Sequence, residues 1–176
     1  MNAIKQLLKY LSITAILVVL DHATKYWAIV SLKGKHYWPA DGELFRLDYA
    51  ENYNMIFSLK FIPMPLVNIM AIGAMGLLFY LLWQYKDQHA LPSIGLAFIL
   101  GGAFGNIPER LIRGYVVDFI SFDWPDWLIF TRWPTFNVAD SAVNIGMILY
   151  LGYVFFIEGR ENSSEKFDVE APAEES

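Results

Sequence analysis

The sequence contains no cysteine among its 176 residues. This absence excludes disulfides, a thiol nucleophile, thiolate metal sites and lipidation of a cysteine of the chain itself. The three histidines, His22, His36 and His89, are scattered rather than spaced as metal ligands, so we expect neither a metal nor another cofactor. No Gly-x-Ser-x-Gly motif or Ser/Lys dyad stands out either, which disfavours a serine nucleophile.

Basic patches are also missing, so the sequence does not indicate nucleic-acid binding. The formal net charge is -5, and much of it comes from residues 161–176 at the C-terminus. This acidic tail has too few apolar residues to form a core, and we expect it to be disordered. The sequence has no internal repeat, and its length permits one domain, which we place at residues 1–160.

Apolar residues are in excess, since 56% of the chain is hydrophobic and 16% is aromatic. Ordinary soluble domains are roughly 45–50% apolar and do not gather those residues into long runs. A helix needs about 20 apolar residues to cross a bilayer. Four stretches meet or approach this length, at about residues 7–30, 65–83, 91–107 and 138–157. The sequence therefore predicts an α-helical integral membrane protein with four transmembrane helices.

The first stretch has an alternative interpretation as a secretory signal peptide, because Lys5 and Lys9 precede its apolar run. However, the helical pattern continues past residues 21–25 into residues 26–32, and no convincing small-x-small cleavage site follows. We therefore favour a membrane span.

The segment between the first two spans has the pattern of a β-strand. Phe45, Leu47 and Tyr49 alternate with charged residues, and this period of two favours a strand or hairpin lying on the membrane surface. With four spans, this β-rich segment and the segment at 108–135 lie on one side of the membrane, and both termini lie on the other. Lysines and arginines flank both sides, so the positive-inside rule does not decide the orientation.

Polar residues within spans are informative, because ionisable groups are costly there and usually face the protein interior. Asp21, Thr24 and Lys25 share one face of the first helix. They fit either a site-supporting group or a helix end near the headgroups with a lysine that snorkels to water.

The fourth span begins with a second polar set, in which Asn137, Asp140 and Asn144 share one face. Asp140 has no basic residue within a turn. It is either a functional carboxylate with a partner elsewhere in the fold or a helix-capping residue. Asp118 has apolar residues on both sides, which is unusual for a surface loop.

The third span ends in a Gly-x-x-x-Gly pattern, at Gly101 and Gly105, which permits close contact between helices. Asn106 and Arg110 follow one turn apart. Arg110 is either an interfacial anchor or a ligand-binding residue.

Five motifs occur along the chain in a recognisable order. They are Asp21-His22-Ala23-Thr24-Lys25, Asn52-Tyr53-Asn54-Met55-Ile56-Phe57, Gly105-Asn106-Ile107-Pro108-Glu109-Arg110, Gly114-Tyr115-Val116-Val117-Asp118-Phe119 and Phe136-Asn137-Val138-Ala139-Asp140-Ser141. In that order they resemble the Asp-x-x-Thr-Lys, Asn-x-Gly-Ala-Ala-Phe, Gly-Asn-x-x-Asp-Arg, Gly-x-Val-x-Asp-Phe and Phe-Asn-x-Ala-Asp-Ser motifs of the lipoprotein signal peptidases, or signal peptidase II. Each motif alone is weak, but five in order on four spans are specific.

The resemblance implies a membrane aspartic endopeptidase that removes signal peptides from prolipoproteins, cleaving before a diacylglyceryl-modified cysteine. It implies that Asp118 and Asp140 are the catalytic pair. The residues expected to line the site and bind substrate are Asn52, Asn106, Arg110 and Asn137, with Asp21 and Lys25 in support. The implied partners are the lipid-modified signal peptide and membrane lipid. We expect a monomer in the bacterial inner membrane, with cytoplasmic termini and an extracytoplasmic active site.

Two neighbouring carboxylates cannot both ionise easily, so such a pair shares one proton and titrates as a unit. The ionised member can activate a water, and the protonated member can donate to the scissile carbonyl oxygen. The predicted chemistry is general acid–base hydrolysis without a covalent intermediate.

The sequence departs from the family pattern at a few positions. Asn54, Met55 and Ile56 stand where the family has Gly-Ala-Ala, Glu109 replaces an aspartate, and Ser121 replaces an acid that often occurs there. We expect these changes to affect substrate preference and inhibitor fit more than chemistry.

Two other functions remain as alternatives. One is a non-catalytic membrane binding paralogue of the same fold, which would have little reason to retain both Asp118 and Asp140. The other is a small proton-coupled transporter subunit using Asp21, Lys25 and Asp140, which would need a polar path across the whole membrane.

Overall fold

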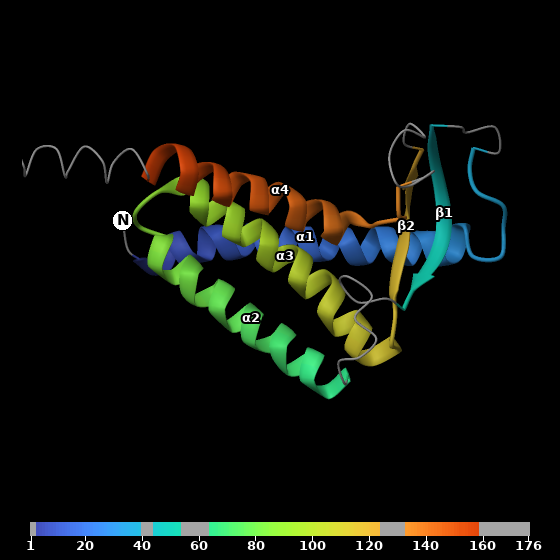
Figure 1. The fold of residues 1–176 in the computed structure, drawn as a ribbon, viewed down its shortest axis with the longest axis horizontal. Helices are drawn as coiled ribbons and strands as arrows, with labels where there is room; N and C mark the ends of the chain where they lie inside the picture. The colour runs from blue at the N-terminus through green and yellow to red at the C-terminus, as the bar shows by residue number, and fades with distance from the viewer. Residues whose placement is uncertain (1–2, 40–43, 54–63, 124–132, 159–176) are drawn as a thin grey trace, which may run out of the picture.

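A computed structural model describes residues 3–39, 44–53, 64–123 and 133–158. Within these residues, four helices and two strands follow one another in the order that Figure 1 shows. They are α1 Ala3–Ser31, β1 Phe45–Asn52, α2 Met64–Tyr85, α3 Ala90–Arg113, β2 Val116–Phe122 and α4 Val138–Tyr153, the last continuing as a π-helical turn at Val154–Glu158. The predicted fold class is confirmed, with each expected span on one helix. The acidic tail and residues Asn54 to Ile56 lie outside the described residues.

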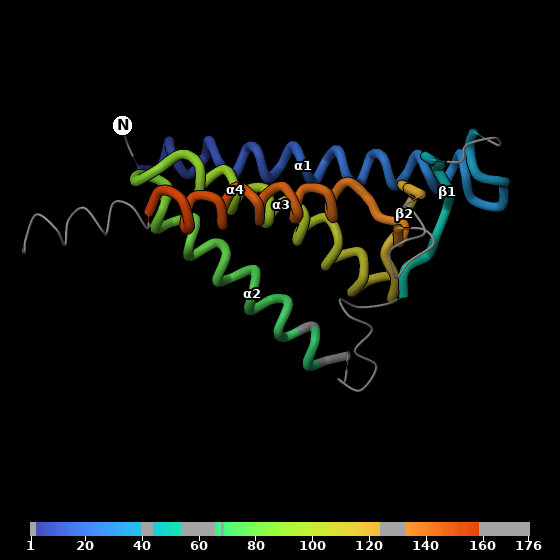
Figure 2. The backbone as a smooth tube through the Cα atoms, turned by 45° about the horizontal axis from the view of Figure 1, so that its top comes forward, coloured from blue at the N-terminus to red at the C-terminus, as the bar shows by residue number. Residues whose placement is uncertain are grey.

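The helices form a bundle around α3, which contacts α1, α2 and α4. The start of α1 and the end of α4 lie at one end of the bundle, and the strands lie at the other (Figure 1). Helix α2 meets the bundle at its C-terminal end and lies apart from it at its N-terminal end (Figure 2). Toward the end of the bundle where α1 starts and α4 ends, Leu82 of α2 packs with Tyr10 of α1 and with Leu96 and Leu100 of α3 in an apolar cluster.

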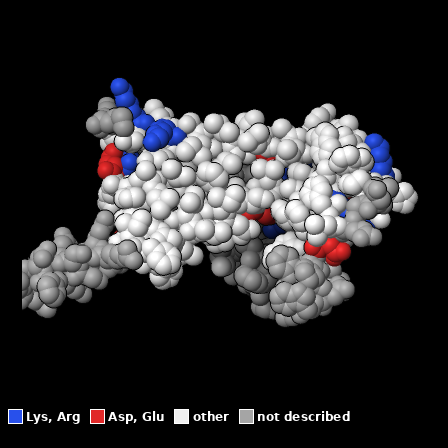
Figure 3. All heavy atoms as spheres, turned by 90° about the horizontal axis from the view of Figure 1, so that it is seen from above, with Lys and Arg blue, Asp and Glu red and all other residues white. Residues whose placement is uncertain are grey.

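The surface of the bundle is that of a membrane protein. In the part of the chain that the structure describes, three helical segments are long and apolar enough to cross a bilayer, at Ala3–Ser31, Ala90–Arg113 and Val138–Glu158, and a shorter apolar helix spans Ile69–Tyr85. Large apolar side chains such as Ile148 point outward. Charged side chains on the face seen in Figure 3 lie mainly at the two ends, with a largely uncharged band between them. Such a band matches the hydrocarbon region of a bilayer.

The predicted Gly-x-x-x-Gly pattern brings α3 against its neighbours. A Cβ atom at Gly101 would lie 2.8 Å from the Cβ of Leu17 in α1. One at Gly105 would lie 2.7 Å from Oδ2 of Asp21 and 2.8 Å from the Cβ of Ala139 in α4. Glycine therefore lets three helices meet where the polar residues of the chain gather.

Helix α3 is longer than the predicted span, which ended at Ile107. It continues through Pro108 to Arg113, and Gly114 caps it in a left-handed conformation. A proline inside a helix removes one hydrogen bond and usually ends the helix nearby. Here the turn after Pro108 is stabilised by an ion pair between Glu109 and Lys25 of α1, with 3.1 Å between Nζ and Oε2.

The predicted strand is present as β1, but its partner, β2, follows α3 in the chain. β1 pairs antiparallel with β2, from Phe45 opposite Phe122 to Asn52 opposite Val116. A strand at β2 was not predicted, because it is a nearly continuous buried apolar run without alternation. The β-rich segment between the first two spans is thus one half of a sheet that joins two distant parts of the chain.

The sheet rests on the end of α1. Val117 and Phe119 of β2 pack with Ala28 and Leu32 in a second apolar cluster. Since successive side chains of a strand point to opposite faces, Asp118 between them faces away from this cluster.

Candidate active site

Asp118 is held in β2 with only 2% of its surface exposed. Its Oδ2 accepts a hydrogen bond from Nδ2 of Asn52 at 2.8 Å, and its Oδ1 accepts one from Nδ2 of Asn137 at 2.7 Å. Burial raises the pKa of Asp118 from its ordinary value of 3.8 to about 6; the amide of Asn52 opposes this shift, the charge of Asp140 adds to it and the amide of Asn137 opposes it. Asp118 therefore exchanges its proton near neutral pH.

Asp140 lies in the first turn of α4 and forms a capping box with Asn137. Its Oδ2 accepts from the backbone N–H of Asn137 at 3.1 Å, and its own N–H donates to Oδ1 of Asn137 at 2.9 Å. Its Oδ1 accepts from Nδ2 of Asn106 at 2.8 Å. The capping interpretation is thus confirmed, while the catalytic role of the same carboxylate stays a prediction.

Asn137 joins the two aspartates. It is fully buried, and it contacts Asp118 through its side-chain amide and Asp140 through its backbone N–H. Its Nδ2 also lies 3.2 Å from Oδ1 of Asn106 and 3.3 Å from the carbonyl oxygen of Val117. One residue therefore brings carboxylates from two different elements side by side.

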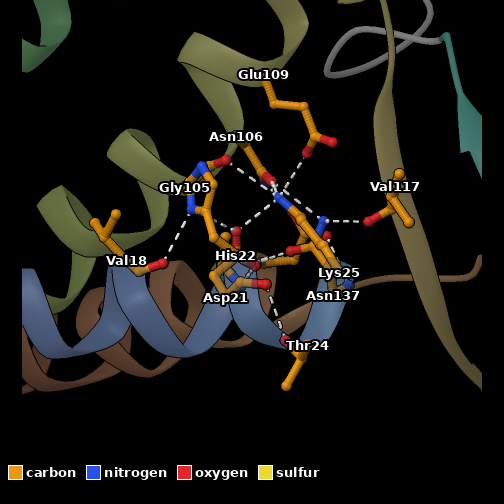
Figure 4. A network of polar contacts seen from close by, with 12 residues as sticks. Val18, Asp21, His22, Thr24, Lys25, Gly105, Asn106, Glu109, Val117 and Asn137 are labelled. Atoms are coloured by element: carbon orange, nitrogen blue, oxygen red, sulfur yellow. Dashed lines mark hydrogen bonds and ion pairs between the residues drawn. The ribbon is translucent and has the colours of Figure 1, made fainter. Parts of the chain in front are cut away.

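Lys25 of α1 contacts several polar groups around the two aspartates. Figure 4 shows its side chain reaching from α1 toward Gly105, Asn106 and Glu109 of α3. Its Nζ lies 2.6 Å from Oδ1 of Asn106, 3.1 Å from the carbonyl oxygen of Gly105 and 2.7 Å from Oδ2 of Asp21. The alternative of a lysine snorkelling to water is wrong, because Lys25 is only 3% exposed.

Asp21 connects α1 to the start of α4. Its Oδ1 accepts from the backbone N–H of Ala139 at 2.9 Å, while its Oδ2 pairs with Lys25. The first N–H groups of a helix have no partner within the helix, and negative charge is favoured near them. Asp21 therefore fixes the first turn of α4, which carries Asp140.

Two charged residues of α3, Glu109 and Arg110, lie next to these groups. Glu109 was not predicted as a site residue, although its position three residues after Asn106 places it near the same helix face. Its carboxylate pairs with Lys25 and with Arg113, and Nη1 of Arg113 lies 3.4 Å from Oε1 of Glu109. Arg110 interacts electrostatically with Asp118 and Asp140. Within the described residues, its buried Nε has no hydrogen-bond partner and it forms no ion pair with either aspartate.

Seven of the eight predicted site residues thus form one hydrogen-bonded network, and Arg110 lies beside it. Two other residues of the predicted polar faces lie outside it. Thr24 donates back to the carbonyl oxygens of Leu20 and Asp21 in its own helix, and Asn144 is exposed. Among the described residues, no three His, Cys, Asp or Glu side chains gather as metal ligands would.

Comparison with known proteins gives a consistent result. Residues 13–156 match the Peptidase_A8 family, described as signal peptidase (SPase) II. The lipoprotein signal peptidase of Psychromonas ingrahamii is 37% identical over 153 residues, covering 85% of this chain and 86% of the relative. That of Pelodictyon phaeoclathratiforme is 38% identical over 149 residues, covering 81% and 87%.

The fold is also that of solved membrane enzymes. A bacterial membrane enzyme determined by the in meso method at 2.3 Å resolution matches with a TM-score of 0.66 and 21% identity, over 96% of this chain and 93% of that one. A second, at 1.9 Å resolution, matches with a TM-score of 0.68 and 23% identity, over 85% and 94%. This bacterial multi-pass membrane protein therefore belongs to the signal peptidase II family, the aspartic endopeptidases that cleave the signal peptides of prolipoproteins.

Proposed function

We propose that Asp118 and Asp140 are the catalytic pair of this peptidase. The observation that carries the proposal is the position of Asn137, which bonds to both carboxylates at once and so holds them together. A shared site for two carboxylates favours a single proton between them, with one member ionised and the other neutral. The raised pKa of Asp118, about 6, is consistent with this division.

In this mechanism the pair acts on a water and the scissile amide together. The ionised carboxylate takes a proton from the water as the oxygen attacks the carbonyl carbon, and the neutral carboxyl donates its proton to the carbonyl oxygen. As the tetrahedral intermediate collapses and its C–N bond breaks, one carboxyl donates its proton to the leaving amine, and the other carboxylate takes a proton from a hydroxyl of the intermediate. The pair ends with one proton, as it began, and no covalent intermediate with the enzyme forms.

The surrounding residues have distinct parts in this proposal. Asn52, Asn106 and Asn137 donate to the aspartates and orient them. Arg110 has an unsatisfied buried donor near the pair and is suited to bind a carbonyl or other oxygen of the substrate. Asp21 and Lys25 do not contact the substrate; they support the site by fixing Asn106 and the start of α4, as their bonds described above indicate.

The substrate we propose is a prolipoprotein whose cysteine carries a diacylglyceryl group. Two acyl chains anchor such a precursor at the membrane, with about 0.8 kcal/mol for each methylene removed from water. The strands, one of which carries Asp118, lie at one end of the helix bundle (Figure 1). In this proposal the acyl chains lie along the apolar helices while the peptide lies over the sheet. Lipid binding of this kind would fix the register of the cysteine relative to Asp118 and Asp140.

We further propose that both termini are cytoplasmic, that the sheet and the site face the extracytoplasmic side, and that the protein acts as a monomer. The orientation follows the family resemblance, because the charges flanking the spans do not decide it.

The position of the polar network disfavours the transporter alternative. A proton path would need polar groups along the bundle. The network of Asp21, Lys25 and Asp140 lies near the sheet, and the other end of the bundle is filled by the apolar cluster around Leu82 and Leu96. The binding-paralogue alternative is disfavoured because both aspartates and their amide donors are in place.

Replacing each aspartate tests the proposal. With purified protein in detergent and a diacylglyceryl-modified precursor, Asp118→Asn and Asp140→Asn should each lower kcat by roughly 10²–10⁴-fold, without sensitivity of the wild type to chelators. Asp87→Asn is the matched control, since Asp87 is an exposed acid paired with Lys86 outside the network. Wild-type kcat in either site variant would refute the proposed pair.

A further inference from the structure

We propose that Glu51 is a positioning residue that holds the end of β1, so that Asn52 donates to Asp118. This inference rests on the proposed function, because it assigns Glu51 an effect on the Asp118–Asp140 pair. It adds a residue on the opposite face of the sheet, which touches neither aspartate.

The carboxylate of Glu51 gathers donors from three places. Its Oε1 accepts from Nζ of Lys33 at 2.9 Å and from the hydroxyl of Tyr49 at 2.8 Å. Its Oε2 accepts from the hydroxyl of Tyr53 at 2.6 Å. Lys33 follows the end of α1, Tyr49 lies within β1 and Tyr53 follows the strand, so one side chain connects the helix end to both flanks of Asn52.

The strand needs such a connection at this point because its pairing with β2 is interrupted. The register shifts between Leu47 and Ala50, so that two residues of β1 lie opposite one residue of β2. After this bulge, β1 has only the pairs from Ala50 to Asn52 before the strand ends. Tyr53 adds a ring contact with Tyr115, with centroids 5.3 Å apart.

Neighbouring residues of a strand point to opposite faces, so the side chains of Glu51 and Asn52 lie on opposite faces of the sheet. Glu51 faces Lys33 and the end of α1, and Asn52 faces Asp118 and donates to its Oδ2. Movement of the strand end would lengthen the bond from Asn52. A hydrogen bond to a carboxylate favours its charged form, so losing this bond raises the pKa of Asp118.

A single exposed ion pair would not hold the end of β1 in place, because such pairs contribute little to stability. The pair between Lys33 and Glu51 is exposed, with 52% of the Lys33 side chain accessible. What distinguishes Glu51 is the two tyrosine hydroxyls on either side of Asn52. Together with Lys33 they lower the pKa of Glu51 to about 2, with Tyr53 the largest cause, so the carboxylate stays charged over the working pH range.

The test is a pH profile of kcat/KM on a diacylglyceryl-modified precursor for Glu51→Leu, Glu51→Gln and Tyr53→Phe. We expect Glu51→Leu to lower kcat/KM by roughly five- to tenfold and to move the limb of the profile that reports Asp118 to higher pH. Glu51→Gln, which keeps one acceptor oxygen, and Tyr53→Phe, which removes one donor, should give smaller shifts in the same direction. The control Asp87→Asn removes a surface acid paired with lysine outside the site and should leave the profile unchanged.

A double-mutant cycle identifies the route of the effect. If Glu51 acts through Asn52, then Glu51→Leu in an Asn52→Ala background causes little further loss and no further shift of the limb that reports Asp118. Equal losses in both backgrounds, or a loss without a shift, overturn the inference. Retained activity in Asp118→Asn would instead overturn the proposed function, whereas an inactive Asp118→Asn with a wild-type profile for Glu51→Leu rejects this inference alone.

Discussion

The ammonium of Lys25 lies 2.6 Å from Oδ1 of Asn106, and Nδ2 of the same Asn106 donates to Asp140. An ammonium can only donate, so it must face the amide oxygen and not the nitrogen. The charge on α1 thereby determines which atom of Asn106 reaches Asp140. Through this contact, a residue that touches neither aspartate sets the hydrogen bonding of one of them.

Lys25→Met should therefore lower both activity and stability. Removing one partner of a buried ionic group leaves the others uncompensated, at a cost of about 3–5 kcal/mol, and here Asp21 and Glu109 lose their shared partner. We expect a lower melting temperature in detergent and loss of cleavage. Lys9→Met, an exposed lysine of the same helix over the ring of Tyr10, is the control and should change neither quantity. Normal melting of Lys25→Met would contradict the structural role of the pair.

Gly105→Ala should destabilise the protein at the meeting point of three helices. The new methyl group would lie 2.7 Å from Oδ2 of Asp21 and 2.8 Å from the Cβ of Ala139, so α1 or α4 must shift. Overpacking of this kind costs about 1–3 kcal/mol. Gly76→Ala in α2 is the matched control, because nothing lies within 4 Å of a Cβ there. Equal melting temperatures of the two variants would show that α3 does not need this approach.

The rate should fall as pH rises above the pKa of Asp118, about 6. The charge of Asp140 helps to raise this pKa, so the proton that Asp118 loses is the one the pair shares, and without it no neutral carboxyl remains to donate to the carbonyl oxygen. Stability has the same sign: because the folded state binds this proton more tightly, the contribution of Asp118 is complete below about pH 4 and is lost as pH rises through about 6. A profile of kcat/KM against pH checks the rate, and a flat profile up to about pH 8 would contradict it.

The sequence predicted the spans and most of the site because those features are local. Apolar runs mark the helices, and spacings such as that of Asp21 and Lys25 place polar groups on one face. The parts that were missed depend on contacts between distant segments. β2 has no alternating pattern because both its faces are covered, and α3 passes Pro108 because Glu109 pairs with Lys25 across the bundle. Neither cause is visible in a short stretch of sequence.

The contacts of Glu51 and of Asp21 could likewise not be predicted from a short stretch of sequence. The motif around Asn52 predicted that this residue belongs with Asp118, but nothing in the sequence indicates that Glu51 beside it faces Lys33. That contact exists only because α1 ends beneath the sheet. Likewise, the sequence named Asp140 as a possible helix-capping residue, and the structure has the cap at Asn137 in a capping box with Asp140. The second cap, from Asp21 to Ala139, needs α1 to lie alongside.

The proposed orientation can be tested directly because the chain has no cysteine. Lys35→Cys places a thiol after α1 at the sheet end, and Asp87→Cys places one in the turn between α2 and α3; both positions are exposed. In spheroplasts, a membrane-impermeant maleimide should label Lys35→Cys and should label Asp87→Cys only after lysis. The reverse pattern would place the site on the cytoplasmic side and refute the proposed topology.

Cleavage should depend on the lipid of the substrate. If the bundle binds the acyl chains, they fix the register of the cysteine at the aspartates, and loss of such positioning costs roughly 10²-fold in rate. We therefore expect a precursor with an unmodified cysteine to be cut at least that much more slowly, and precursors with shorter acyl chains to fall between the two. Asp118→Asn provides the background rate for each precursor. Equal cleavage of modified and unmodified precursors would mean that the peptide alone sets the register at the aspartates.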